Sequence, residues 1–328
     1  MLSGRGRAQS VCAGLLLLWC ALFLHTRTTE QSMIRAVMLE RGAEGWTAGL
    51  VYQAPEGSAD SSEAQAEVRF AAAEGETLAY ALAGAEALLP EEANYRLCDY
   101  LLLAPGADLA LLDEYETLVL DSQCGRVSAR VLRCGFDCAE LSEQSEEADA
   151  LPEKLLQCVK DAAPAAPCLY TRQSGLVLPQ LELTEEALRA ADAGVFLSGA
   201  GEQPLDAAQT AAIRLMTGAG GTPVPFWLDG ARCAVRCRSR AVTPEQGGGF
   251  VLRLDCQTAA GAQPLTAQQT AELAALCTQA VQDFWAKGVD LMQLRPAAAL
   301  RQGPGAGPDP ERDACPPLRT EVRSVFDF

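Results

Sequence analysis

The sequence predicts an α+β fold built from several small domains, in which mostly antiparallel sheets are packed with helices. Several short segments alternate apolar and polar residues, which is typical of strands with one buried face. Other segments repeat apolar residues every three or four positions, as amphipathic helices do. Strand and helix segments do not follow one another with the regular βα period that a doubly wound parallel sheet requires, so we expect mixed α+β domains.

Residues 1 to 29 predict a signal peptide or membrane anchor. Arg5 and Arg7 precede an uninterrupted apolar run at Val11–Leu24. As a helix this run spans about 21 Å, which is shorter than the roughly 30 Å of bilayer hydrocarbon. No small-x-small cleavage motif follows it, and two alternatives stay open. The segment is either an uncleaved, short signal anchor or the site of lipid attachment at Cys20, although the bulky Trp19 before that cysteine is unfavourable for a lipid.

Composition excludes several function classes. The net charge of -17 disfavours nucleic acid as a partner, because phosphates would be repelled. The one histidine, His25, lies in the leader, so the rest of the chain has no Ser-His-Asp triad, Cys-His pair or His-bound metal. Carboxylates are plentiful but form no distinctive motif that would indicate a hydrolase. We therefore expect no enzyme, no catalytic residues, no cofactor and no metal ligands.

The 13 cysteines form no C-x-x-C motif, and an odd number cannot all pair within one chain. Two C-x-x-x-C pairs occur, Cys134/Cys138 and Cys233/Cys237. The second pair falls on a strand-like segment, where residues four apart share a face. We expect these cysteines to be small buried side chains, and metal or disulfide roles are the less favoured alternatives.

An N-terminal α+β domain is expected over residues 30–185. Met33–Glu40 and Trp46–Ala54 flank a glycine-containing turn and predict a hairpin. Thr77 is expected to cap a helix whose stripe begins at Leu78, and a second helix is expected at Asp108–Leu120. The remaining expected segments are a strand at Arg126–Cys134, an acidic loop or helix edge at Glu140–Ala150, a short helix at Leu151–Val159 and a linker-like break at Ala162–Pro167.

A C-terminal α+β domain is expected over residues 190–328. Its first helix follows Asp206, a plausible N-cap, and its long helix covers 266–287 behind Thr266. The long helix carries an apolar stripe at Leu273, Leu276, Cys277, Ala280, Val281 and Phe284. Ala231–Val242 and Gly249–Thr258 predict a long antiparallel pair. An alternating segment from Leu318 predicts a closing strand.

Four arginines give the expected long hairpin a positive stripe. They are Arg232, Arg236, Arg238 and Arg240. On so acidic a chain this stripe would face lipid or an acidic partner, or it would pair with local carboxylates. We favour the pairing with local carboxylates.

The order of these segments resembles the Ger(x)C family, the C subunits of spore germinant receptors, over most of residues 30 to 328. In the first half the resemblance rests on the hairpin Ile34–Ala54, on Glu74-Gly75-Glu76-Thr77-Leu78 before an alanine-rich helix, and on Val177-Leu178-Pro179. In the second half it rests on Gly194-Val195-Phe196, on Leu205 with the following helix, and on the long helix ending Trp285-Ala286-Lys287-Gly288-Val289-Asp290-Leu291. The final alternating strand also agrees with this family.

The resemblance implies a germinant-receptor C-subunit-like fold and a non-enzymatic, membrane-anchored subunit needed for nutrient-triggered spore germination. Members are usually lipoproteins, and here Cys20 lies in an atypical lipidation sequence. The expected partners are the integral-membrane A and B subunits, and the expected location is the outer face of the spore inner membrane. The alternative is an anchored extracellular solute- or wall-binding module unrelated to germination. A defined ligand pocket would favour the alternative, and a flat apolar patch would favour the receptor subunit.

Overall fold

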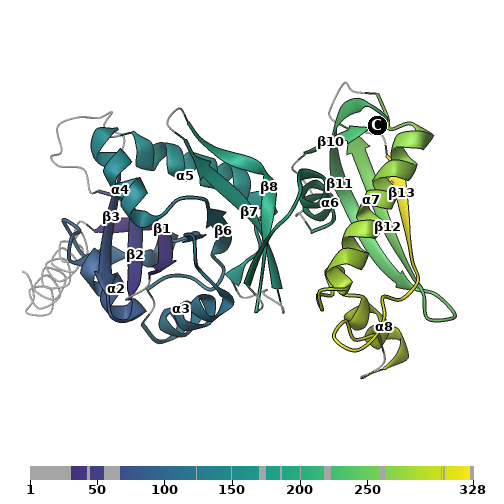
Figure 1. Ribbon diagram of the computed structural model, residues 1–328, viewed down its shortest axis with the longest axis horizontal. Coiled ribbons are helices and arrows are strands. Elements are labelled where there is room, and N and C mark those ends of the chain that lie inside the picture. Colours follow the sequence, from purple (N-terminus) through teal and green to yellow (C-terminus); the bar gives the residue numbers. More distant parts are fainter. Residues whose placement is uncertain are drawn as a thin grey trace, which may run out of the picture.

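The computed structural model shows two β-sheets and seven α-helices in the part of the chain that it describes (Figure 1). The described residues are 31–42, 45–54, 67–122, 124–148, 150–169, 175–184, 187–199, 201–217, 223–258, 263–303, 305 and 307–325. The mixed α+β class predicted from the sequence is confirmed. The segment 1–29, for which a signal peptide or membrane anchor is expected and which contains the apolar run and Cys20, lies outside the described residues.

The first sheet has nine strands, and eight of them follow the order β3-β2-β1-β5-β6-β7-β8-β9, with β4 paired to β1. The predicted hairpin is confirmed by antiparallel pairing of β1 and β2. The strands are β1 (Ser32–Arg41), β2 (Trp46–Gln53), β3 (Val68–Gly75), β4 (Ala93–Asn94), β5 (Tyr100–Leu103), β6 (Arg130–Cys134), β7 (Gly175–Leu183), β8 (Leu188–Ser198) and β9 (Gly201–Pro204).

The centre of the first sheet is parallel, which the sequence did not predict. Strands β1, β5, β6 and β7 run in the same direction. Helix α3 (Leu109–Ser122) connects β5 to β6, while α4 (Cys138–Glu147) and α5 (Leu151–Ala162) connect β6 to β7. Strands β5 and β6 are only four and five residues long and are buried on both faces, as is typical of parallel strands covered by helices.

Helices cover both faces of this sheet and enclose two cores. On one face α2 (Leu78–Glu86) and α3 bury residues such as Leu82 and Tyr115. On the other face α4 and α5 bury residues such as Leu141 and Leu155. The acidic segment expected at Glu140–Ala150 is largely helix α4, because the Asp137 carboxylate accepts a hydrogen bond from the Glu140 N–H at 2.7 Å and starts the helix there.

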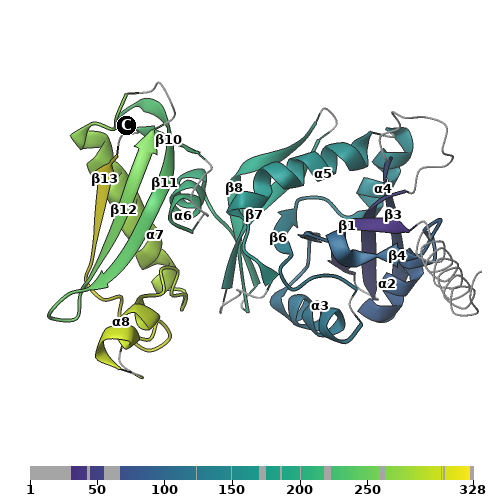
Figure 2. The ribbon, with the colours of Figure 1, turned by 180° about the vertical axis from the view of Figure 1, so that it is seen from behind.

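The second sheet has the order β10-β11-β12-β13, and helices cover one of its faces. The predicted pairing of two long strands is confirmed, and the closing strand lies parallel to its neighbour. Figure 2 shows β11 and β12 in front of α7. The elements are β10 (Val224–Leu228), β11 (Ala231–Pro244), β12 (Phe250–Thr258), β13 (Leu318–Ser324), α6 (Ala207–Thr217), α7 (Ala267–Trp285) and α8 (Leu294–Gln302).

The chain passes from the first sheet to the second after β9. Strand β8 pairs with β7 and β9 pairs with β8, although we expected residues from 190 onward to belong to the C-terminal domain. The expected break at Ala162–Pro167 contains the short 3-10 helix η2 (Ala163–Ala165) and leads back into the first sheet. Helix α6 then lies between β8 and the second sheet (Figure 1).

Among the described residues, no helix combines the length and the apolar character needed to cross a bilayer.

Candidate functional site at the junction of the two sheets

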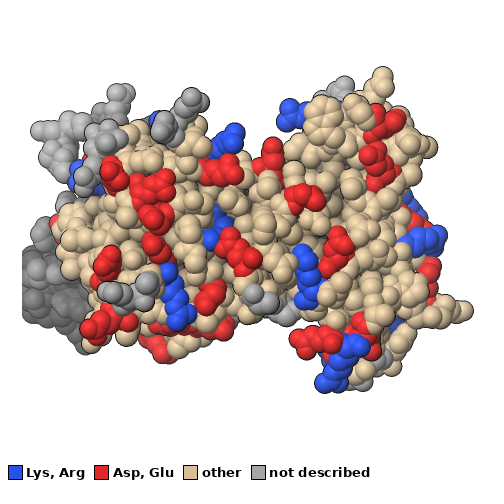
Figure 3. All heavy atoms as spheres, viewed as in Figure 1, with Lys and Arg blue, Asp and Glu red and all other residues tan. Residues whose placement is uncertain are grey.

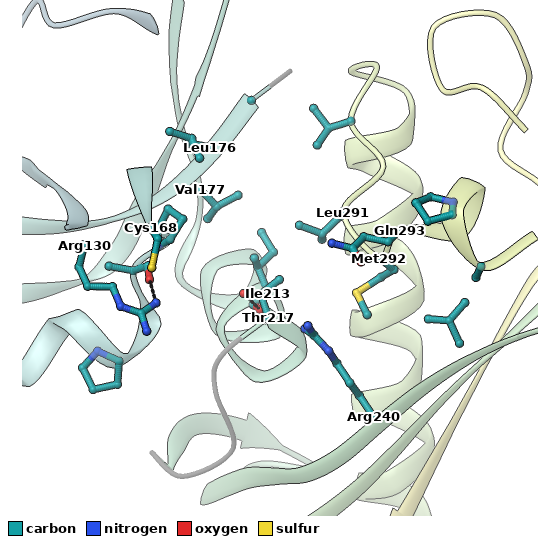
Figure 4. A pocket seen from close by; sticks show the side chains of 18 of the residues that line it. Arg130, Cys168, Leu176, Val177, Ile213, Thr217, Arg240, Leu291, Met292 and Gln293 are labelled. Atoms are coloured by element: carbon teal, nitrogen blue, oxygen red, sulfur yellow. Dashed lines mark hydrogen bonds between the residues drawn. The ribbon is translucent and has the colours of Figure 1, made fainter. Parts of the chain in front are cut away.

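A pocket of about 530 Å³ lies where the two sheets meet (Figure 4). One wall comes from the first sheet, through the start of β6, the segment before β7 and the first residues of β7. The opposite wall comes from α6, β11, the 289–293 segment and α8. This volume is within the range of small-molecule sites in proteins, which is about 300 to 1,000 Å³.

The two units are joined beside this pocket by an aromatic contact. Phe196 belongs to β8 of the first sheet, but its buried ring packs in the core of the second unit. Its centroid lies 4.7 Å from that of Phe284 on α7, with the rings at 77°. The Lys287 ammonium lies 5.4 Å from the Phe196 centroid and 5.1 Å from the Phe284 centroid. Edge-to-face pairs and cations over ring faces are both attractive, so this cluster ties α7 to β8.

Hydrogen bonds at Gly194 connect β8 to the start of α6. The Gly194 N–H donates to the Thr210 hydroxyl at 2.9 Å, and its carbonyl accepts from the Leu205 N–H at 3.0 Å. A side chain at Gly194 would lie 2.9 Å from the Leu178 carbonyl oxygen and 3.1 Å from the Thr210 methyl group. Glycine is therefore needed for this close approach of helix and strand.

Arginine supplies the only charged side chains among the described residues that line the pocket. Arg130 donates to the Ala166 carbonyl at 2.8 Å, and Arg240 donates to the Met216 carbonyl near the end of α6. On the face shown in Figure 3, acidic side chains are spread over both units while Lys and Arg are scattered. The pocket therefore has the opposite sign to the chain as a whole, which carries a net charge of -17.

The far wall depends on the turn before α8. Gln293 lines the pocket with a φ of 57°, in the left-handed region that non-glycine residues rarely occupy. Three positions earlier, buried Asp290 accepts hydrogen bonds from the Leu294 and Arg295 N–H groups, both at 2.8 Å. Burial raises the pKa of Asp290, and these backbone N–H groups oppose that effect. Asp290 thus starts α8 and fixes the turn that holds Gln293 at the pocket wall.

The lining predicts binding of an amphipathic small molecule with an anionic group. Val177, Ile213, Leu291 and Met292 supply apolar surface (Figure 4). Each guanidinium has five N–H groups, so one backbone bond leaves donors for a carboxylate or similar anion. The arrangement combines an apolar body with a few fixed polar groups, as binding pockets do.

The cysteines singled out from the sequence are not brought to this pocket. Cys134 and Cys138 are buried beside β6 and α4, and burial raises the pKa of Cys134 to about 12. Cys237 is buried and Cys233 is half-buried on one face of β11. This agrees with the expectation of small buried side chains. Within the described ranges, no group of three or more His, Cys, Asp or Glu side chains is placed to hold a metal ion.

The expected arginine stripe is divided between the two faces of the second sheet. Arg232 and Arg236 lie on the face away from the helices, where Arg236 donates to the Gln257 side chain at 2.6 Å. A bulge between Cys237 and Ser239 shifts the register of β11. Beyond it, Arg240 lies on the helix-covered face and reaches α6. Simple alternation along the strand does not reveal this change.

No protein-family model, curated protein or solved structure matches this chain. The family resemblance drawn from the sequence therefore stays a prediction.

Proposed function

We propose that this chain is a membrane-anchored, non-enzymatic subunit of a spore germinant receptor complex, needed for nutrient-triggered germination. The observation that carries the proposal is the order of strand and helix segments, which resembles the Ger(x)C family. The junction pocket, whose walls come from both units, gives such a subunit a place to bind a ligand, although by itself a defined pocket favours the binding module considered below. A ligand in it would contact β7 on one side and α6, β11 and α8 on the other. The apolar run at Val11–Leu24 supports the membrane anchoring in the same proposal.

Signalling in this proposal needs no chemical step. A ligand shifts a conformational equilibrium only if it binds two arrangements with different affinity. A pocket formed by two units is suited to this requirement, because any change in their relative position would alter its shape. The integral-membrane A and B subunits would respond to that change in the position of the units through their contacts with this chain at the outer face of the spore inner membrane.

The first test is the germination of spores that lack this gene, followed as loss of optical density after nutrients are added. We expect normal sporulation and a specific failure to germinate. Complementation with Ala297→Trp, which fills the pocket from α8, should fail, and Ala275→Trp on the exposed side of α7 should succeed. Normal germination of the deletion strain with every nutrient would contradict the proposal.

A second candidate is an anchored extracellular solute- or wall-binding module unrelated to germination. The observation in its favour is the pocket itself, which has the size of a small-molecule site and a positive lining. This candidate predicts that small carboxylates raise the melting temperature of the full-length protein, that Arg240→Ala weakens the effect, and that the deletion strain germinates normally.

A further inference from the structure

Cys237 on β11 and Cys256 on β12 lie directly opposite each other in the second sheet. Both face the helix-covered core, and both carry free thiols. They are 19 positions apart in the sequence and are brought together only by the register of this hairpin. The pair lies outside the junction pocket and has no role in the proposed function.

The hydrogen-bonding pattern shows which kind of cross-strand pair this is. The Cys256 carbonyl accepts from the Val325 N–H at 2.8 Å, so the backbone polar groups of Cys256 point away from β11. The Glu245 N–H donates to the Gly249 carbonyl at 2.8 Å at the hairpin end, which gives the same alternation along β12. Cys237 and Cys256 therefore form a non-hydrogen-bonded pair, the kind with the closest side chains and a Cα separation of about 4.5 Å.

This spacing suits a disulfide. Disulfides join Cα atoms about 4.4 to 6.8 Å apart whose Cβ atoms point the same way. Opposite residues of an antiparallel pair meet both conditions, since their side chains leave the same face of the sheet. The bulge after Cys237 gives β11 local freedom to adjust.

The pKa of Cys237 is lower than that of Cys256, so Cys237 is the thiol that more readily forms the attacking thiolate. A hydrogen bond between them lowers the pKa of Cys237 and raises that of Cys256, and nearby Arg240 further lowers the pKa of Cys237. Cys237 Sγ contacts the Ser239 carbonyl at 3.2 Å, close to the surface-exposed bulge. A third core thiol, Cys277, lies on α7 and therefore forms no cross-strand pair. It is buried, and burial raises its pKa to about 12.

We propose that Cys237 and Cys256 form an intrachain disulfide that joins β11 to β12 when the protein meets a disulfide-bearing oxidant. The Cys237 thiolate attacks one sulfur of the oxidant, forming a mixed disulfide and releasing one thiolate. The Cys256 thiol then loses its proton to water, and its thiolate attacks the Cys237 sulfur and releases the second oxidant thiolate. The protein loses two hydrogen atoms, and the oxidant disulfide is reduced to two thiols.

The crosslink would fix the strand that carries a pocket residue. Arg240 follows Cys237 by three positions along β11, and the bulge lies between them. In the reduced protein this part of β11 is held by backbone hydrogen bonds and side-chain packing. In the oxidised protein a covalent bond would also hold it to β12.

The test counts thiols in the full-length protein before and after incubation with oxidised glutathione. Samples are denatured in the presence of N-ethylmaleimide, which labels free thiols, and their intact masses are measured by mass spectrometry. Oxidised protein should carry two fewer maleimide groups than reduced protein. Tandem mass spectrometry of a digest should find the peptides of Cys237 and Cys256 linked, a measurement that needs no variant.

Three variants assign the bond. Cys237→Ala should retain all of its remaining thiols after oxidation. Cys256→Ala should lose one thiol and gain the mass of one glutathione at Cys237, because no second thiol resolves the mixed disulfide. Cys277→Ala, a matched core control, should still lose two. The proposal is overturned if the unsubstituted protein keeps every thiol, or if the linked peptides contain a different cysteine pair.

Discussion

Phe196→Ala tests whether β8 holds the two units together. Phe196 is 1% exposed, and its ring packs against Phe284 of α7 rather than into either core of the first unit. Removing a buried phenylalanine side chain costs about 3 to 5 kcal/mol. We expect a loss of this size in the stability of the second unit, because the cavity opens between β8, α6 and α7.

The neighbouring residue provides a matched control. Leu197 is also 1% exposed, but its side chain points to the opposite face of β8, into the core beneath α2 and α3. Leu197→Ala should cost about 2 to 5 kcal/mol in the first unit. Limited proteolysis of the full-length protein, followed by mass spectrometry, distinguishes the two outcomes. Phe196→Ala should expose cleavage sites after residue 204, and Leu197→Ala should expose sites before it.

A double-mutant cycle with Phe284→Ala measures the contact itself. Aromatic pairs contribute about 0.5 to 1.5 kcal/mol beyond the area that they bury. The double variant should therefore lose less stability than the two single variants together, by about this amount. Additive losses, or identical cleavage patterns for the Phe196 and Leu197 variants, would refute the assignment of Phe196 as the link between the units.

Gly175→Ala should destabilise the protein by about 1 to 3 kcal/mol, because its new Cβ would lie 2.4 Å from the Phe196 ring. Gly199→Ala, with no atom within 4 Å, should leave the melting temperature unchanged. Burial raises the pKa of Asp290 above its ordinary value of 3.8, so the folded protein binds the carboxyl proton more tightly than the unfolded chain does. The stabilisation that this proton gives is complete below pH 3.8 and is lost as the pH rises through the folded pKa. The stability of the unsubstituted protein relative to Asp290→Asn should therefore fall between pH 3.8 and neutrality in urea unfolding curves. The disulfide proposed for β11 and β12 closes a loop of about 20 residues and should raise the unfolding free energy by about 3 kcal/mol, measured with and without reductant.

Local patterns predicted most of the helices and both long hairpins. The N-caps Thr77, Asp206 and Thr266 accept hydrogen bonds from the third residue beyond them, as expected from their place before apolar stripes. The strand predicted at Arg126–Cys134 contains β6, but its parallel pairing with β5 was not predicted. Both strands are short and buried on both faces, and the residue pattern of one strand does not show which strand it pairs with or in which direction.

Helix α8 and the pocket were missed for a different reason. The helix begins after a left-handed Gln293 and depends on Asp290, four residues before its first turn. The pocket joins segments between residues 130 and 300 that are distant in sequence. No local window contains that information, because it depends on how the second unit packs on β7 and β8.

Strand β8 explains why the sequence suggested two domains and why their border was hard to find. Its backbone belongs to the first sheet, while one face of its end, through Phe196, belongs to the core of the second unit. Leu197, one position later, belongs to the first core. Consecutive residues of one strand thus contribute to two cores, so neither unit can shift at this point without disturbing the packing of the other. A ligand in the adjacent pocket would act on the place where the two units are mechanically coupled, and this is the physical basis for expecting binding and conformation to be linked here.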